Sequence, residues 1–174
     1  MKKLLTMAAV TMIAVASHAA AVGWTIAGGT AYKGGAYDLF IIGMNGVEST
    51  SQIAALVAAG TSVDSYAFYT GGTVNNSGAA TLTAASSGKS IAYSGTGTDT
   101  YQAFAVLWTS DAKEATYTST ASISLVNDST AKTFAFGNQS TNFSANNFSV
   151  APEPTSGLLM LLGMAGLALR RKRA

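Results

Sequence analysis

Residues 101–126 read YQAFAVLWTSDAKEATYTSTASISLV, and this stretch decides the fold class. Tyr101 to Thr109 is apolar on both faces, which is typical of a central strand. From Thr116 to Val126 the residues alternate, which predicts a half-buried strand with a threonine and serine outer face. The polar connection Ser110 to Ala115 lies between them. The two segments are therefore predicted to form an antiparallel hairpin.

Shorter segments elsewhere share the strand pattern and are separated by turns rich in glycine and asparagine. The further strand candidates are Val22–Ala27, Tyr37–Met44, Ser65–Thr70, Ala79–Ala84, Ser90–Tyr93, Thr130–Phe136 and Asn147–Val150. Seven to nine short strands at this spacing predict an all-β fold, either an antiparallel β-sandwich or a jelly roll. A β-solenoid is the structural alternative, although no fixed-period repeat is present.

One segment has the pattern of a helix instead. Residues 49–52 (STSQ) have the spacing of a capping box, Ile53 and Val57 follow at helical spacing, and Gly60 stands where a C-terminal cap is expected. We therefore expect one short helix near residues 50–59, laid across one end or open edge of the sandwich.

The N-terminal residues 1–21 have the composition of a secretory signal peptide with a short apolar helix. Lys2 and Lys3 form the charged start, residues 4–16 form an apolar run interrupted only by threonines, and residues 17–21 (SHAAA) offer small residues for cleavage. Cleavage after Ala19 and cleavage after Ala21 both satisfy the small-x-small rule, and the sequence leaves that choice open. Export through the secretion translocon and cutting by signal peptidase would leave a β-rich mature domain over residues 22–151.

The C-terminal residues 152–174 form a separate segment in three parts. These are Pro152, Glu153 and Pro154, then the apolar run Gly157–Leu169, then the basic residues Arg170, Arg171, Lys172 and Arg173. The prolines end the folded body, because they can neither continue a helix nor lie inside a sheet. As a helix, the thirteen apolar residues span roughly 20 Å against roughly 30 Å for a bilayer core. A transmembrane helix here is short, and the basic residues favour its cytoplasmic end.

This order of three parts resembles the PEP-CTERM sorting signal of Gram-negative bacteria. The resemblance covers residues 152–174 only, so it concerns destination and processing. It implies recognition of Pro152, Glu153 and Pro154 by an exosortase, an integral-membrane cysteine protease that acts near this motif. The hydrophobic segment would then be a transient inner-membrane anchor, removed before the body reaches the cell envelope, the cell surface or the medium.

The charge of the body differs from that of the whole chain. Six of the ten lysines and arginines lie in the two terminal segments, which leaves four in residues 22–151 against seven acidic residues, a formal charge of minus three. The sequence pI of about 8.9 therefore reflects the sorting segments. A nucleic-acid partner is excluded on this ground, because no basic patch remains.

The body, taken as residues 22–151, lacks the residue types of several catalytic centres. It contains no cysteine and no histidine, so a Ser-His-Asp triad, a cysteine nucleophile and the usual zinc sites are excluded. Glycoside hydrolysis needs only two carboxylates, yet Asp38 and Glu48 show no recognisable signature. Asp99 and Asp128 lie in oxygen-rich loops that lack the ligand spacing of a calcium site. We expect no catalytic residues, no metal and no cofactor.

The aromatic residues are the remaining candidates for a binding site. Phe104, Trp108 and Tyr117 are expected in the core, because a body with few Leu and Ile needs them to fill it. Trp24 and Tyr32 lie beside glycine-rich loops and are the candidate glycan contacts. The sequence favours a non-enzymatic, exported envelope or extracellular-matrix protein, and the resemblance to PEP-CTERM proteins implies its association with exopolysaccharide. A carbohydrate-binding module and a small carboxylate-dependent glycoside hydrolase are the alternatives.

Overall fold

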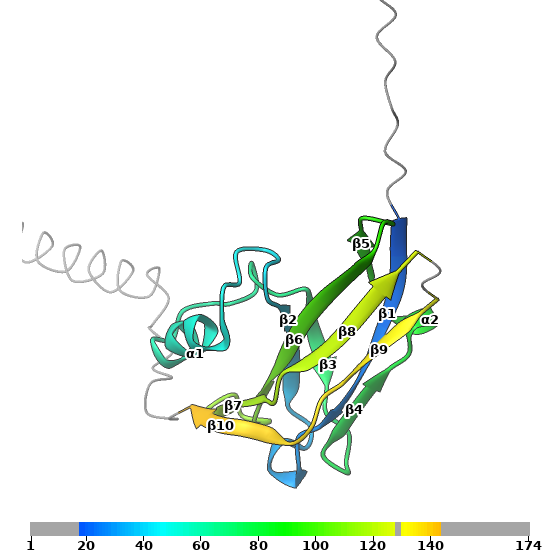
Figure 1. Cartoon of the computed structure of the whole chain (residues 1–174). Helices are drawn as coiled ribbons and strands as arrows, with labels where there is room; N and C mark the ends of the chain where they lie inside the picture. The colour runs from blue at the N-terminus through cyan, green and yellow to red at the C-terminus, as the bar shows by residue number, and fades with distance from the viewer. Residues whose placement is uncertain (1–17, 128–129, 144–174) are drawn as a thin grey trace, which may run out of the picture.

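The computed structural model describes residues 18–127 and 130–143, and Figure 1 shows their arrangement. The strands are β1 (His18–Ala27), β2 (Ala36–Ile41), β3 (Tyr69–Thr73), β4 (Ala79–Leu82), β5 (Ser90–Tyr93), β6 (Thr98–Trp108), β7 (Ala115–Thr118), β8 (Ala121–Val126), β9 (Lys132–Ala135) and β10 (Gln139–Phe143). The helices are η1 (Thr30–Tyr32), α1 (Thr50–Ala58) and α2 (Ala84–Ser87).

The strands form two sheets that pack face to face, which confirms the predicted all-β sandwich. The four-stranded sheet has the order β4-β1-β5, with β9 also paired to β1. The six-stranded sheet has the order β10-β7-β6-β2-β3, with β8 paired to β6. All pairings are antiparallel except that of β9 with β1, which is parallel and was not predicted. Two open sheets of this kind do not form the predicted alternative, a solenoid.

The main core lies between the two sheets. Its largest fully buried side chains include Trp24 from β1, Leu39 from β2, Leu107 from β6 and Phe134 from β9. Alternate residues of each strand face this core, as the period of a pleated strand requires. Burial of these apolar side chains is the main contribution to the stability of a body that contains no cysteine.

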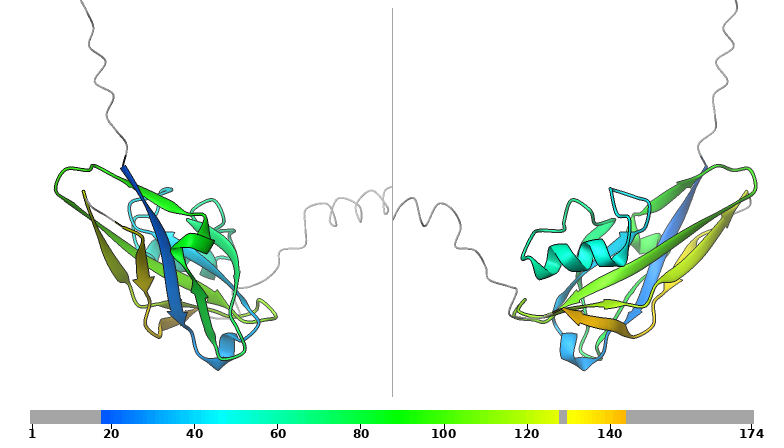
Figure 2. Two further views of the ribbon diagram at one scale, coloured as in Figure 1. Left: turned by 90° about the vertical axis from the view of Figure 1, so that its right-hand side faces the viewer. Right: turned by 60° about the vertical axis from the view of Figure 1, so that its left-hand side comes forward.

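A second apolar cluster covers the outer face of the six-stranded sheet. Phe40 and Phe104 project from that face and pack against Ile53 and Val57 of α1. The helix therefore lies over the sheet as a third layer, on its own side of the sandwich (Figure 2). The expectation that it crosses one end or an open edge is wrong. This layer also explains why β6 is apolar on both faces, because each face meets a different core.

The helix itself begins as its sequence predicts. Ser49 is the N-cap, and its Oγ accepts a hydrogen bond from the backbone N–H of Gln52 at 3.2 Å. The Gln52 side chain in turn accepts from the backbone N–H of Glu48 at 2.7 Å. Gly60 follows the last turn with a φ of +68°, the left-handed conformation expected after a helix end.

The predicted strand from Thr116 to Val126 is interrupted at Ser119 and Thr120. β8 and β7 pair with successive parts of β6, and the alternation holds only in β8, where Ile123 and Leu125 are buried. In β7, Thr116 and Thr118 are fully buried, so the predicted polar outer face is wrong there. Thr118 Oγ1 accepts a hydrogen bond from the Ala105 amide at 3.0 Å, which satisfies both polar groups away from water.

Other boundaries differ from the predictions. β3 begins at Tyr69, four residues after the predicted start at Ser65, and the predicted strand Ala79–Ala84 ends at Leu82, before α2. β10 was not predicted, and the predicted strand Asn147–Val150 lies outside the described residues. No helix in residues 18–127 or 130–143 is long and apolar enough to cross a membrane. The predicted signal helix and C-terminal helix fall outside these ranges.

Candidate functional site: a groove beside Trp108

The two predicted glycan contacts lie in the core. Trp24 is fully buried, and its Nε1 donates a hydrogen bond to the Tyr37 hydroxyl at 2.8 Å. Tyr32 is only 4 % exposed, and burial raises the pKa of its hydroxyl. A sugar ring stacks on an exposed aromatic face, so this burial removes Trp24 and Tyr32 as glycan contacts. Their position beside glycine loops did not indicate which layer would cover them.

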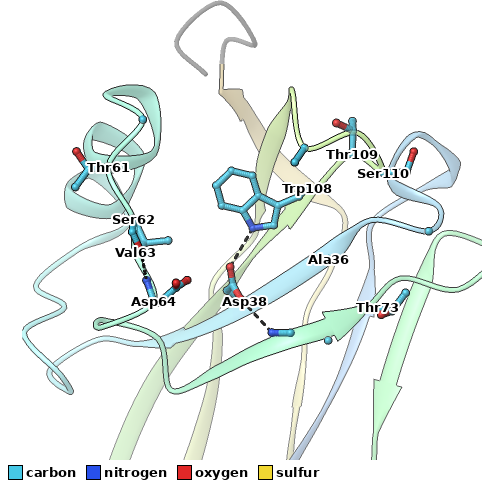
Figure 3. Close-up of a pocket in the computed structure, with 15 residues that line it drawn as sticks. Ala36, Asp38, Thr61, Ser62, Val63, Asp64, Thr73, Trp108, Thr109 and Ser110 are labelled. Atoms are coloured by element: carbon cyan, nitrogen blue, oxygen red, sulfur yellow. Dashed lines mark hydrogen bonds between the residues drawn. The ribbon is translucent and has the colours of Figure 1, made fainter. Parts of the chain in front are cut away.

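A groove instead opens on the outer face of the six-stranded sheet, at the end that α1 leaves uncovered. Its floor includes Ala36 and Asp38 of β2 and Trp108 of β6. The segment 60–64 after α1 lines it, as do Thr109, Ser110 and Ala112 of the β6–β7 connection (Figure 3). Its volume of about 770 Å³ falls within the range of small-molecule sites.

Small residues make the groove hollow. Ala36 and Gly71 lie on the floor of the groove. Farther along the same sheet, the outer face carries the bulky side chains of Phe40 and Phe104 instead. Gly71 has a φ of +76° and lies where the pairing of β2 with β3 shifts register. This irregularity has the form of a β-bulge, which leaves a backbone amide outside the regular ladder.

The carboxylate of Asp38 binds that amide and the indole of Trp108. Asp38 Oδ1 accepts from the Gly71 N–H at 3.4 Å, and Oδ2 accepts from Trp108 Nε1 at 3.0 Å. In Figure 3 the Trp108 ring stands above Asp38, with Ser62, Val63 and Asp64 across the groove. Trp108 is only partly buried. Asp38 therefore fixes the orientation of an aromatic ring that packs partly against the outer cluster and partly lines the groove.

The electrostatics of the groove are acidic. Asp38 is 7 % exposed, and burial raises the pKa of its carboxyl, while the hydrogen bonds from Trp108 and Gly71 act in the opposite direction. The nearby charge of Asp64 raises the pKa of Asp38 slightly further. Among the described residues that line the groove there is no lysine, arginine or histidine. An anionic ligand would therefore be repelled, whereas a neutral polyhydroxyl ligand would not.

Several hydroxyl groups complete the lining. They belong to Thr61, Ser62, Thr73, Thr109 and Ser110. A hydroxyl can both donate and accept a hydrogen bond, which suits a ligand that carries hydroxyls of its own. The Thr109 hydroxyl is already engaged within the fold, since it donates to Asp111 Oδ1 and accepts from the Glu114 amide. Within the described residues no group of three or more His, Cys, Asp or Glu side chains gathers as a metal site would require.

The sequence predicts Phe104, Trp108 and Tyr117 in the core, but only Phe104 is fully buried, and Trp108 and Tyr117 are partly buried. Two features of the sequence could have indicated the groove. Trp108 is followed by the polar run Thr109-Ser110-Asp111. Asp38 is a single acid inside an apolar strand, where a carboxylate needs specific partners.

The sorting residues Pro152, Glu153, Pro154, Arg170, Arg171, Lys172 and Arg173 lie outside the described part of the chain. Comparison with curated proteins and with solved structures finds no significant match. One family model matches, the PEP-CTERM protein-sorting motif, over residues 150–173. This confirms the resemblance at the C-terminus, and the chain carries a PEP-CTERM sorting motif after its β-sandwich.

Proposed function

We propose that this chain is a non-enzymatic component of the cell envelope or extracellular matrix whose groove beside Trp108 binds neutral saccharide units of an exopolysaccharide. The PEP-CTERM motif implies export, membrane-associated sorting and an exosortase as processing partner. The matrix location and the saccharide ligand are the new parts of the proposal.

The observation that carries the saccharide proposal is the fixed, accessible indole of Trp108. Its Nε1 is held by Asp38 on the neighbouring strand, so the ring loses little further freedom when a ligand arrives. An aromatic face packs against the apolar face of a pyranose ring, and the surrounding hydroxyls match the sugar's hydroxyls. The described residues of the lining include Asp38 and Asp64 and no cationic side chain, which favours neutral sugars over uronates or phosphorylated sugars.

A carboxylate-dependent glycoside hydrolase is the second candidate, because Asp38 and Asp64 line the same groove. A raised pKa is also what a general acid needs. However, Asp38 is almost fully buried and both of its oxygens already accept hydrogen bonds within the fold. A general acid must reach the glycosidic oxygen of its substrate. The geometry therefore favours Asp38 as a positioning residue for Trp108.

The binding test uses the exported protein and neutral polysaccharide extracted from the envelope of the producing bacterium. Trp108→Ala removes the ring, and Ala36→Glu fills the floor of the groove without removing a buried group. Each should weaken binding about tenfold or more, equivalent to about 1.4 kcal/mol. The matched controls are Tyr93→Ala, a partly exposed aromatic on β5, and Thr81→Glu, the same added charge on exposed β4.

Unchanged affinity in both groove variants would contradict the proposed site. Stronger binding of uronate-rich than of neutral polysaccharide would contradict the proposed ligand class. Release of reducing ends by the wild type, lost in Asp38→Asn and in Asp64→Asn, would instead establish the hydrolase.

The sorting test is cell fractionation in a host that retains its sorting machinery. Wild-type protein should leave the inner membrane in a shortened form. Replacement of Pro152, Glu153 and Pro154 by alanine should leave the full-length tail on a membrane-bound form, whereas Thr155→Ala with Ser156→Ala should be processed normally. Wild-type protein that stays uncut in the inner membrane would contradict this part of the proposal.

A further inference from the structure

The first strand of the sandwich begins inside the predicted signal peptide. β1 starts at His18, and its first four residues pair with all four residues of β5: His18 with Tyr93, Ala19 with Ala92, Ala20 with Ile91 and Ala21 with Ser90. β5 has no other strand partner among the described residues. These four residues therefore belong to the folded body.

Side-chain packing supports the same boundary. Ala20 is 2 % exposed and lies in the main core with Ile91. The His18 ring lies 5.5 Å from the ring of Tyr93, centroid to centroid. A Cβ at Gly95 would clash with the His18 ring, so the loop after β5 approaches this histidine closely. Both ends of the segment thus have specific partners in the sandwich.

Cleavage at either site expected from the sequence would damage this arrangement. A cut after Ala21 removes every residue of β1 that pairs with β5. It also exposes the side of Ile91 that faces Ala20. A cut after Ala19 removes His18 and places a charged α-amino group on Ala20, a buried residue of the core. Unpaired strand edges and buried charges are both unfavourable.

We propose that signal peptidase cuts this chain after Ala16, so that the mature protein begins at Ser17. Ala14-Val15-Ala16 satisfies the small-x-small rule. The apolar run from Leu4 to Ile13 then has ten residues, within the roughly 7–15 typical of this region, and the sixteen-residue signal lies at the short end of the roughly 15–30 range. This cut leaves β1 complete.

The proposal changes the composition of the mature protein. Its N-terminus would be Ser17, directly before the strand, and His18 would be retained as the single histidine of the chain. The body taken as residues 22–151 has none.

The test is N-terminal sequencing and intact-mass measurement of the protein exported by a Gram-negative host from the full-length gene. The expected terminus is Ser17. Two matched variants separate the sites. Ala16→Asp places a charge directly before the proposed cut and should abolish the Ser17 terminus. Ala19→Asp, at an exposed position of β1, lies in the recognition positions of both alternative cuts and should leave the Ser17 terminus unchanged.

A wild-type terminus at Ala20 or Val22, abolished by Ala19→Asp and unaffected by Ala16→Asp, would overturn the proposal. An exported protein that keeps residues 1–16 would also overturn it. Neither result bears on the groove, so this test and the saccharide-binding test fail independently.

Discussion

Trp108 and Asp38 stand on neighbouring antiparallel strands, and the indole N–H of one donates to the carboxylate of the other at 3.0 Å. This pair combines a buried acid with an accessible aromatic ring on a single sheet face. The bond gives the ring a defined orientation, and its loss would leave a buried carboxylate oxygen short of a donor. The stability of this region and the proposed saccharide binding therefore depend on the same contact.

The first prediction concerns this hydrogen bond. Trp108→Phe keeps an aromatic ring but removes the donor to a charged acceptor, so it should lower the free energy of unfolding by about 1.5–3 kcal/mol in urea denaturation. The comparison is the same substitution in an Asp38→Asn background, where the acceptor is a neutral amide. The loss there should be smaller, about 0.5–1.5 kcal/mol. An equal loss in the two backgrounds would contradict the charged-acceptor role of Asp38.

The second prediction concerns pH. Burial raises the pKa of Asp38 in the folded protein above the reference value of 3.8, so the folded state binds a proton more tightly than the unfolded state. The stability that this carboxyl contributes is fully present below pH 3.8 and is lost as the pH rises through the raised pKa. As the pH falls through this window, the unfolding free energy of the wild type should therefore rise relative to that of Asp38→Asn.

A further variant tests the cause of the pH effect. Asp64→Asn removes a charge that raises the pKa of Asp38, so it should move the same window slightly toward lower pH. Urea denaturation at a series of pH values measures both effects. If the unfolding free energies of wild type and Asp38→Asn differ by a constant amount across the window, the pKa of Asp38 is not raised.

The third prediction concerns the buried threonine of β7. Thr118→Val preserves shape but leaves the Ala105 amide without its side-chain acceptor, which should cost about 1–3 kcal/mol of unfolding free energy. Thr120→Val, at an exposed position between β7 and β8, should change it by no more than about 0.5 kcal/mol. Equal effects of the two substitutions on the denaturation midpoint would argue against the Thr118 bond.

The fourth prediction concerns the start of α1. Ser49→Ala removes the side-chain acceptor for the Gln52 amide and should destabilise the protein by about 1 kcal/mol. Ser51→Ala, exposed in the first turn, changes the same side chain without touching the cap and should be neutral or slightly stabilising. Thermal denaturation of the two variants measures the difference, and a loss confined to Ser51→Ala would be inconsistent with the cap.

Local patterns in the sequence predicted the features that depend on local interactions. The helix cap at Ser49 and the turn at Gly60 follow from residues a few positions apart. The apolar character of β6 on both faces correctly indicated a central strand. In each case the residues that form the pattern also make the contacts.

The remaining features depend on partners far along the chain. The bulge at Gly71 lies beside Asp38, which is thirty-three positions earlier in the chain. No local pattern near either residue indicates that the two are in contact. The burial of Thr118 depends on Ala105, and the parallel pairing of β9 with β1 joins strands that are about a hundred residues apart in the chain. Which tryptophan remains accessible was settled by the layers that cover each sheet face. Trp24 lies between the two sheets. Trp108 lies on the outer face of the six-stranded sheet, at the edge of the area that α1 covers.

The most direct test of the groove is an NMR titration of the ¹⁵N-labelled exported protein with neutral oligosaccharides from the envelope polysaccharide. The chain has two tryptophans, so the indole N–H region holds one signal from Trp108 and one from Trp24. The proposed site predicts that the Trp108 signal shifts to saturation while the Trp24 signal, from a fully buried ring, stays in place. A Trp108 signal that does not move in the presence of polysaccharide that binds the protein would contradict it.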